Sequence, residues 1–225
     1  MILPQDDGLK AVVAALGGDV RLVGGVVRDT LAGQVTKDID LATPLLPEKV
    51  IEKLSAAGIK CVPTGLAHGT VTAVVEGRPF EITTLRRDVS TDGRRATVTF
   101  TDDWQEDAAR RDFTVNALYA DPDTGEIQDY FGGVSDLEAG IVRFIGEPLT
   151  RIAEDHLRIL RFFRFNARFG KGTPHAESLA ACRVRANDLM ALSRERIAME
   201  LLAILALPNP KSAIGLMIDN GIFVP

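Results

Sequence analysis

The sequence is poor in cysteine and histidine, and it has no long apolar run. Its 225 residues include two cysteines and three histidines. Cys61 and Cys182 lie far apart and have no partners at metal-ligand spacing, so neither a disulfide framework nor a zinc site is indicated. No stretch approaches the ~18 apolar residues of a transmembrane helix, and the first residues lack a charged leader with an apolar core. We therefore expect no membrane association and a cytoplasmic location.

The chain also lacks an excess of positive charge. Its net charge is −5 and its pI is near 5.3, which excludes a bulk attraction to nucleic acid. Residues 151–200 are the exception, with ten Lys and Arg against six Asp and Glu, a local charge of +4. Any RNA contact must come from this local patch. The apolar fraction of 46% is enough to bury one large core or two modest ones.

One glycine-rich segment has the pattern of a phosphate-binding loop. Residues 22–29 read Leu-Val-Gly-Gly-Val-Val-Arg-Asp, an apolar run that ends at Gly24 and Gly25 and is followed by a helical pattern. Unpaired backbone N–H groups and the dipole at a helix start favour an anion. The segment therefore predicts a phosphate-binding site. Taken alone, a Gly-Gly pair before a helix is more often a packing turn than a ligand loop.

Two aspartates follow at a spacing that suits a divalent cation. Asp38 and Asp40 are separated by Ile39 in a β-like context, so both carboxylates leave the same face of a strand. Like charges this close repel each other unless a cation joins them. A pair of Mg²⁺ ions held in this way is what phosphoryl and nucleotidyl transfer use. The alternative for an Asp-x-Asp pair is a solvated strand edge.

A third carboxylate is a candidate for the same site. Glu81 alternates with Phe80 and Ile82 and therefore faces opposite to these apolar neighbours. Glu81 reaches Asp38 and Asp40 only if its strand neighbours theirs. A metal-side carboxylate and an exposed strand glutamate are equally consistent with the sequence.

A second charged motif follows a predicted helix. Asp103 has the position of an N-cap for a helix over 104–112, which delivers Arg110, Arg111 and Asp112 at its end. Two arginines beside an aspartate are frequently just a surface salt-bridge cluster. Before this helix, charged and turn residues over 85–103 predict a long mobile loop.

The remaining pattern predicts an α+β head followed by helices. Strands with period-two alternation and short helices predict a mixed, mostly antiparallel sheet, and beyond Pro148 only helical periods remain. The predicted helices cover 6–16, 47–57, 132–140, 149–169, 174–191, 194–207 and 213–218. The predicted strands cover 20–23, 38–41, 59–62, 70–75, 79–84, 114–119, 127–131 and 141–145.

The predicted helix over 149–169 bears a mostly basic stripe. At ~100° per residue, Glu154, Arg158, Arg161 and Arg168 fall within about 80° of arc, with Asp155 at the edge. A solvated face with i,i+4 pairs is the alternative interpretation.

Donor and acceptor chemistry gives this stripe a sharper interpretation. A carboxylate only accepts hydrogen bonds and a guanidinium only donates them. Cytosine and adenine both present an amino donor beside a ring-nitrogen acceptor, whereas uracil and guanine present the reverse order. A fixed pair of Asp155 and Arg158 would therefore accept C and A and reject U and G.

Three segments resemble, in the same order, the motifs of class II tRNA nucleotidyltransferases and poly(A) polymerases of bacterial type. They are residues 22–29 with Asp38 and Asp40, residues 110–117, and Glu154-Asp155-x-x-Arg158-x-x-Arg161. The resemblance implies a polymerase-beta-like nucleotidyltransferase head over residues 1–146 and an all-α neck over 147–225. The family's body and tail are missing, so we expect a truncated or unusually short member with weaker tRNA binding.

The resemblance also implies residue roles. Asp38 and Asp40 hold two Mg²⁺ ions, and together with Glu81 they are our candidate catalytic residues. The candidate nucleotide-binding residues are Gly24, Gly25, Arg28, Arg111, Asp112, Asn116, Asp155, Arg158, Arg161 and Arg164. By the resemblance, Gly25 and Arg28 contact the triphosphate, Arg111 and Asp112 contact phosphate and sugar, and Asp155 and Arg158 template the base.

The implied reaction is attack of the tRNA 3′-hydroxyl on the α-phosphate of CTP, twice, and then of ATP, with release of pyrophosphate. Residues 61–70 look like the CCA-adding version of a strand-turn-strand, and the charged segment 86–102 resembles an element that CC-adding enzymes have lost. An A-adding enzyme or poly(A) polymerase is the alternative within the family. A catalytically weak RNA-binding module is the alternative from another class. A metal phosphatase or phosphohydrolase is not indicated, because the sequence does not supply the further metal ligands that such an enzyme needs.

Overall fold

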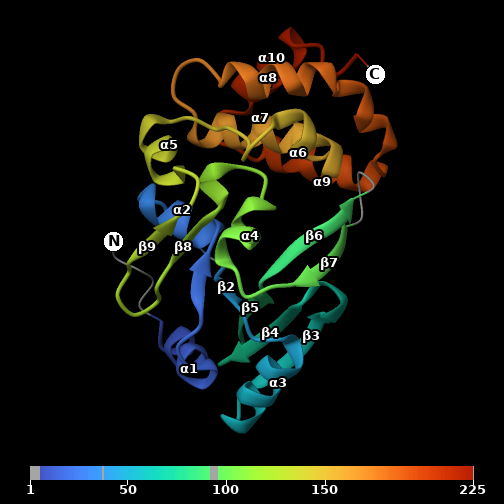
Figure 1. Ribbon diagram of the computed structural model, residues 1–225. Helices are drawn as coiled ribbons and strands as arrows, with labels where there is room; N and C mark the ends of the chain where they lie inside the picture. Colours follow the sequence, from blue (N-terminus) through green and yellow to red (C-terminus); the bar gives the residue numbers. More distant parts are fainter. Residues whose placement is uncertain (1–5, 37, 92–95, 225) are drawn as a thin grey trace. The chain divides into compact units, whose positions relative to one another are not determined.

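Strands dominate the first part of the chain and helices the second (Figure 1). The computed structural model describes residues 6–36, 38–91 and 96–224. The chain divides into two compact units. The first comprises Met1–Asp88, Val98–Arg111 and Asn116–Phe131, and the second comprises Val89–Thr97, Asp112–Val115 and Gly132–Pro225. The functional boundary near residue 146 that the sequence suggests stays a prediction.

The first unit is built on a seven-stranded sheet in the order β3-β4-β5-β2-β1-β8-β9. Within the described part of the chain, β2 and β5 form its one parallel pair, and the other neighbours are antiparallel. This arrangement confirms the predicted mixed, mostly antiparallel sheet. The strands are β1 (Arg21–Val23), β2 (Asp40–Thr43), β3 (Lys60–Gly65), β4 (Thr70–Val75), β5 (Arg78–Thr84), β8 (Leu118–Ala120) and β9 (Ile127–Asp129).

Period-two alternation explains how the sheet buries one face. Val71 and Ala73 of β4 and Phe80 and Ile82 of β5 are buried, whereas their sequence neighbours are at least partly exposed. Helices α1 (Asp7–Leu16) and α3 (Pro47–Ala56) pack against each other, and α3 also contacts β3 and β4. Helix α2 (Gly25–Leu31) lies beside β1 and β8 (Figure 1).

One loop prediction and two strand predictions were wrong in part. The segment predicted as a loop over 85–103 contains a two-stranded sheet of β6 (Arg86–Thr91) and β7 (Ala96–Phe100), while residues 92–95 lie outside the described residues. The run of β-branched residues 97–99, followed by Phe100, has a strand propensity that outweighs the flanking charges. The strand predicted over 114–119 is a 3₁₀ turn, Thr114–Asn116, followed by β8. The strand predicted over 141–145 is reduced to one bridge between Phe113 and Phe144.

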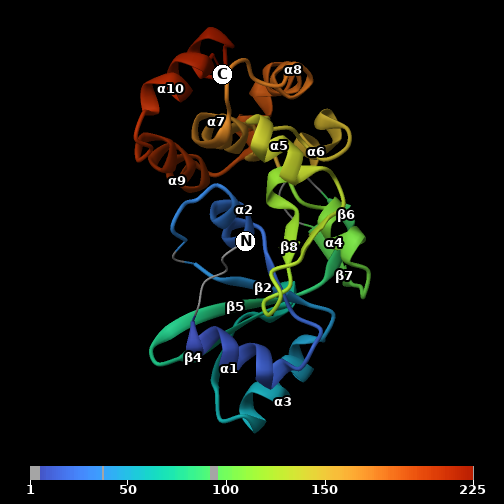
Figure 2. The same cartoon turned by 90° about the vertical axis from the view of Figure 1, so that its left-hand side faces the viewer.

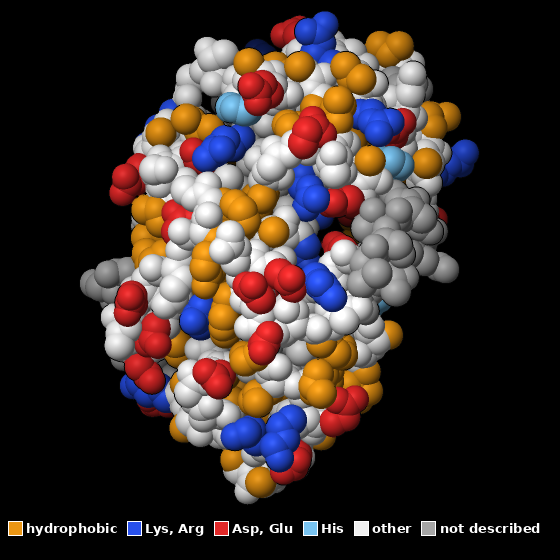
Figure 3. All heavy atoms as spheres, in the orientation of Figure 1, with side chains coloured by type: hydrophobic (Ala, Val, Ile, Leu, Met, Phe, Trp, Pro, Cys, Tyr) orange, Lys and Arg blue, Asp and Glu red, His pale blue; other side chains and the backbone are white. Residues whose placement is uncertain are grey.

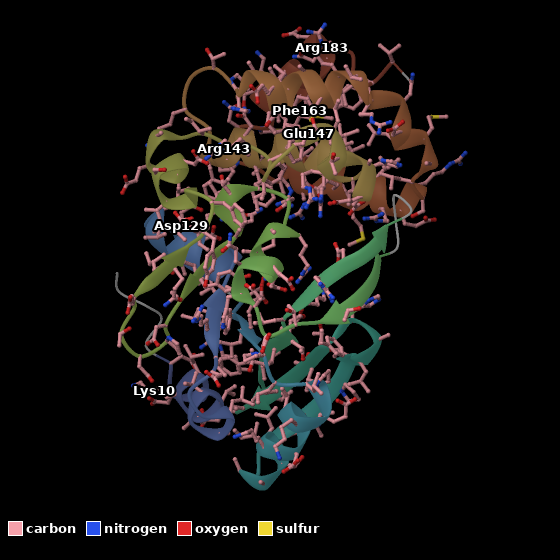
Figure 4. The ribbon with its side chains drawn as sticks, viewed as in Figure 1. Lys10, Asp129, Arg143, Glu147, Phe163 and Arg183 are labelled. Carbon is pink, nitrogen blue, oxygen red and sulfur yellow. The ribbon has the colours of Figure 1, made fainter. Side chains whose placement is uncertain are left out.

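The second unit is helical around an aromatic core. The ring centroids of Phe113 and Phe144 lie 4.8 Å apart, and Phe144 stacks on Phe162 at 6.0 Å. Helix α7 packs against α6, α8, α9 and α10 (Figure 2), and its Phe163 points into the interior of this unit (Figure 4). The helices are α4 (Trp104–Ala109) of the first unit and α5 (Gly133–Ala139), α6 (Pro148–Glu154), α7 (Arg158–Phe169), α8 (Ala176–Val184), α9 (Arg194–Leu205) and α10 (Pro210–Asp219) of the second. Among the described residues, none of these helices has the length and apolarity needed to span a bilayer.

The predicted continuous helix over 149–169 is interrupted. Helix α6 ends at Glu154 and α7 begins at Arg158, because Asp155 takes an extended conformation with φ −152° and ψ 106°. Its carboxylate accepts a hydrogen bond from Leu157 N at 3.1 Å, a local bond that competes with helix continuation. The prediction of one basic stripe through residues 154–168 was therefore wrong, because only the positions within α7 lie on one continuous helix.

Candidate functional site

The acidic residues of the first unit lie on two neighbouring strands. Asp40 opens β2, and its Cα is in register with Glu81 on the parallel strand β5. Residues paired in register on adjacent strands project from the same face. Ile39 is buried, Asp40 is half-buried and Asp38 is exposed, as alternation predicts, although the strand begins only at Asp40. The structure therefore supplies the strand neighbour that Glu81 needs.

The electrostatics of this site favour a cation. Burial and the neighbouring Glu81 raise the pKa of Asp40 to about 6, with Asp38 adding to the effect and Arg111 opposing it. Among the described residues, no three His, Cys, Asp or Glu side chains are arranged to hold a metal ion by themselves. Mg²⁺ is commonly bound by one or two carboxylates together with substrate phosphates. The donor set at Asp40 fits such a shared ion.

Gly24 shapes the loop beside these carboxylates. It adopts φ 67° and ψ −114° at the N-terminus of α2, and its N–H donates to Leu118 O at 2.9 Å. A Cβ built on Gly24 would lie 3.4 Å from Nη1 of Arg111 and 3.5 Å from the carbonyl oxygen of Asn116. A side chain at this position is thus disfavoured by the backbone conformation, and its Cβ would contact Arg111.

We expect Gly24→Ala to lower the melting temperature and to weaken nucleotide binding, because an alanine at φ 67° is strained and its methyl group comes into contact with the Arg111 guanidinium. Holding a non-glycine residue in this conformation costs about 1–3 kcal/mol. Gly33→Ala is the matched control, since Gly33 also has a positive φ of 67° but nothing lies within 4 Å of its added Cβ. Thermal unfolding and calorimetric CTP titration measure both effects. Equal losses of CTP affinity in the two variants would contradict this account of Gly24.

Arg28 lies beneath the same loop. Its side chain is buried, Nε donates to Oδ1 of Asp29 at 2.8 Å, and Nη1 donates to Oδ1 of Asn116. Nη2 lies 3.8 Å from the position of a Cβ on Gly25. The structure therefore brings Gly24, Gly25, Arg28 and Asn116 together. Direct contact of Arg28 with a triphosphate stays a prediction.

Arg111 connects the loop and the acidic strands. Its Nη2 contacts Oδ2 of Asp107 at 3.1 Å, its Nη1 faces Gly24, and its charge acts on Asp40. Sequence reasoning assigned no role to Asp107. The signal was the i,i+3 and i,i+4 spacing from Asp107 to Arg110 and Arg111, which places all three on one side of a helical turn.

Asp112 belongs to the second unit, although it directly follows Arg111. Its Oδ1 accepts a hydrogen bond from Phe113 N at 2.9 Å, and its Oδ2 accepts one from Arg161 Nε at 2.7 Å. Arg164 forms an ion pair with Glu200. The sequence predicted that Asp112, Arg161 and Arg164 contact nucleotide, and the structure shows that each also has a protein partner.

The predicted base-reading pair is held by other side chains of the second unit. Nη2 of Arg196 donates to both carboxylate oxygens of Asp155, at 3.0 and 2.9 Å. Nη1 of Arg158 donates to Oε2 of Glu154 at 2.6 Å and to Arg151 O at 3.0 Å. Sequence reasoning gave Arg196 no role, because no local spacing links it to Asp155.

The candidate residues thus form two groups, one in each unit. The first group contains the acidic strands, the Gly24 loop and Arg111, and the second contains Asp112, Asp155, Arg158 and their ionic partners. That the two groups confront each other across one nucleotide site stays a prediction.

Comparison with known proteins is consistent with these motifs. Residues 20–143 match the family described as "Poly A polymerase head domain", and residues 173–225 match "Probable RNA and SrmB- binding site of polymerase A". The chain is 43% identical to the CCA tRNA nucleotidyltransferase 1, mitochondrial, of Mus musculus over 222 residues, which cover 96% of this chain and 51% of the relative.

Two solved structures are similar over nearly the whole chain. A CCA-adding enzyme of Bacillus stearothermophilus in complex with CTP superposes with a TM-score of 0.86 at 35% identity, covering 98% of this chain and 53% of that one. A CCA-adding enzyme of Thermotoga maritima complexed with tRNA_CCA gives 0.80 at 26% identity, covering 98% and 52%. The chain thus spans about half the length of these relatives. With its head-domain match covering more than half of its residues, the chain belongs to the tRNA nucleotidyltransferase and poly(A) polymerase family.

Proposed function

We propose that this chain adds CCA to the 3′ end of tRNA from CTP and ATP and releases pyrophosphate. The observation that carries the proposal is the convergence of Asp40, Glu81, Arg111 and the Gly24 loop within the first unit. A carboxylate with a pKa raised to about 6 beside an opposing guanidinium suits a site that takes a cation and a triphosphate together. Similarity to CCA-adding enzymes that bind CTP and tRNA supports this choice of substrates.

In this proposal Asp38 and Asp40 hold two Mg²⁺ ions, with Glu81 as the further carboxylate. Ions held by these carboxylates would supply activation of the attacking hydroxyl and stabilisation of the charge on the leaving pyrophosphate. Arg111 neutralises the triphosphate beside Asp40, and the close-approach geometry at Gly24 lets phosphate lie against the backbone. Substrate held in line accounts for much of the rate.

The second unit supplies the choice of base. A carboxylate has about four acceptor sites, and the bonds from Leu157 N and Arg196 to Asp155 use three of them. One acceptor position on Oδ2 is left for an exocyclic amino group. Paired with Arg158 as donor, Asp155 can read the amino and ring-nitrogen edge that C and A share.

Local charge supports an RNA substrate better than net charge does. On the face drawn in Figure 3, Lys and Arg are interspersed with Asp and Glu, so no field of one sign covers it. The excess of positive charge lies in residues 151–200. Phosphate contacts from such a patch make RNA binding depend on salt.

The test of this proposal is incorporation of labelled nucleotides into tRNA ending at the discriminator base. CTP alone is expected to add two residues, CTP with ATP to add three, and ATP alone, UTP or GTP to add almost none. An A-adding enzyme would instead require tRNA ending in CC. A poly(A) polymerase would extend with ATP beyond one residue. RNA binding without incorporation above the level of an Asp38→Ala, Asp40→Ala variant would favour the RNA-binding module and contradict the proposal.

The cellular location is a separate matter. The sequence favours the cytoplasm, and a similar relative is a mitochondrial enzyme. Cytoplasmic location therefore stays a prediction, which localisation of the tagged chain in its own cells checks.

A further inference from the structure

A buried carboxylate that no motif includes lies behind Arg111. Asp107 is only 1% exposed, and its two oxygens accept hydrogen bonds from three elements of the first unit. Oδ1 accepts from the backbone N of Arg86 at 3.1 Å and from Nε of Arg110 at 2.9 Å. Oδ2 accepts from the hydroxyl of Tyr119 at 2.7 Å and from Nη2 of Arg111 at 3.1 Å. A buried charge with this many partners fixes the groups around it.

Arg111 is held at one end by this carboxylate. Its Nη2 is occupied by Asp107, its Nε is buried and has no hydrogen-bond partner in the described structure, and its Nη1 faces the Gly24 loop. The guanidinium also lies over the ring of Tyr119, with 5.5 Å between Cζ and the ring centroid. These contacts leave the Nη1 edge to face an anion lying at the loop.

The Asp107 carboxylate keeps its charge. Burial alone would raise its pKa, but Arg111 and Arg110 outweigh burial, and the bonds from Tyr119 and Arg86 add to their effect, so its pKa falls to about 2. The same network raises the pKa of the Tyr119 hydroxyl, chiefly through burial, so that the hydroxyl remains a donor. The ion pair with Arg111 therefore persists across the neutral range.

We propose that Asp107 is the positioning residue for triphosphate binding: it fixes the Arg111 guanidinium so that its free edge meets the phosphates at the Gly24 loop. The inference rests on the proposed function, because that function places a nucleoside triphosphate at this loop. It adds a residue that acts through Arg111 and does not itself touch the nucleotide. The alternative is a purely structural role in holding α4.

The test compares the binding of CTP and CMP by calorimetry in the presence of Mg²⁺, because the ratio of the two affinities isolates the contribution of the β- and γ-phosphates. Asp107→Asn keeps the shape of the side chain but removes its charge. We expect it to lower the CTP affinity about tenfold, equivalent to about 1.4 kcal/mol, and to leave the CMP affinity unchanged. In an Arg111→Ala background, Asp107→Asn should change the ratio no further, since the two residues act as a unit.

Asp103→Ala is the matched structural control. The Asp103 carboxylate caps the same helix by accepting from Gln105 N and Glu106 N, so its loss weakens α4 without touching the carboxylate of Asp107. It should lower the melting temperature and keep the ratio of CTP to CMP affinity. If Asp107→Asn does not fold, Tyr119→Phe removes one donor to the same Oδ2 and should reduce the ratio two- to threefold.

The outcomes separate the inference from the proposed function. The positioning role is overturned, even if tRNA is extended, by either of two results. One is tight CTP binding that is unchanged in Asp107→Asn, and the other is a ratio of CTP to CMP affinity that falls equally in Asp103→Ala. If the ratio of CTP to CMP affinity depends on Asp107 but the protein extends no tRNA, the positioning role is supported and CCA addition is overturned. A wild-type chain that binds CTP no better than CMP overturns both.

Discussion

Asp40→Asn is expected to reduce CTP incorporation into tRNA by at least about 10³-fold while leaving the fold intact. Asp40 is the half-buried member of the acidic group, in register with Glu81 on the adjacent strand. An amide there keeps the volume but binds a divalent cation poorly, since carboxylate oxygens are the ligands that hard cations prefer. Electrostatic stabilisation of the reacting phosphate is usually the largest single contribution to such a rate.

The same substitution is expected to stabilise the metal-free protein. The pKa of Asp40 is raised to about 6 in the fold, above its ordinary value of 3.8, so its ionisation opposes folding at neutral pH. Asparagine removes that cost, which is at most about 3 kcal/mol for a pKa raised from 3.8 to about 6. At low pH, Asp40 is protonated in both the folded and the unfolded wild type. The extra stability of Asp40→Asn should therefore be full above pH 6 and should vanish as the pH falls below about 4.

Thermal unfolding in EDTA between pH 4 and pH 8 measures this difference, and primer extension measures the activity. Asp19→Asn, at an exposed position of the same unit, is the control for loss of one carboxylate. A variant that is less stable than the wild type at pH 8 would contradict the electrostatic account of this site. Near-normal incorporation by Asp40→Asn would contradict its catalytic role.

Local chemistry made much of the fold predictable. Helix α1 begins after Asp6, whose carboxylate accepts from Leu9 N, and α9 begins after Ser193, whose hydroxyl accepts from Arg196 N. Both starts follow from short-range capping, which a sequence displays directly. The turn at Glu76 and Gly77, with positive φ at both residues, was visible for the same reason.

The errors arose where tertiary context decides. The pattern over 149–169 has helical periodicity throughout, yet Asp155 leaves the helix because its carboxylate bonds to Leu157 N and to Arg196 on a distant helix. The apolar residues over 141–145 suggested a strand, but the ring of Phe144 packs among the phenylalanines of a helical core. Burial alone does not distinguish these two environments.

The candidate site shows the same difference between residues set by local sequence and residues set by tertiary packing. Asp38, Asp40 and the Gly24 loop could be proposed from the sequence because their chemistry lies in contiguous residues. The dependence of Arg111 on Tyr119 through Asp107, and of Asp155 on Arg196, is set by packing between elements far apart in the chain. Charged groups buried by such packing require partners, and a single sequence does not show which partners they have.

Asp155→Asn is expected to change the choice of nucleotide. The local bond from Leu157 N holds the acceptor oxygen of the new amide at the Oδ1 position, which places the NH₂ group at the Oδ2 position. That group donates where the amino groups of C and A also donate, whereas the carbonyl oxygens of U and G accept there. An unpaired buried donor costs about 1–3 kcal/mol, so CTP and ATP incorporation should fall about 10- to 100-fold relative to UTP.

Single-nucleotide incorporation at matched concentrations of CTP and UTP measures this change as a ratio, which is insensitive to partial loss of active protein. Asp188→Asn is the control, because Asp188 is an ion-paired carboxylate of the same unit, 3.2 Å from Arg185, and belongs to neither candidate group. The control should keep the wild-type preference for C. Because NH₂ at the Oδ2 position also faces the guanidinium of Arg196, an additional Arg196→Gln substitution should restore some activity without restoring the preference. An unaltered ratio of C to U in Asp155→Asn would mean that the base is read by other groups.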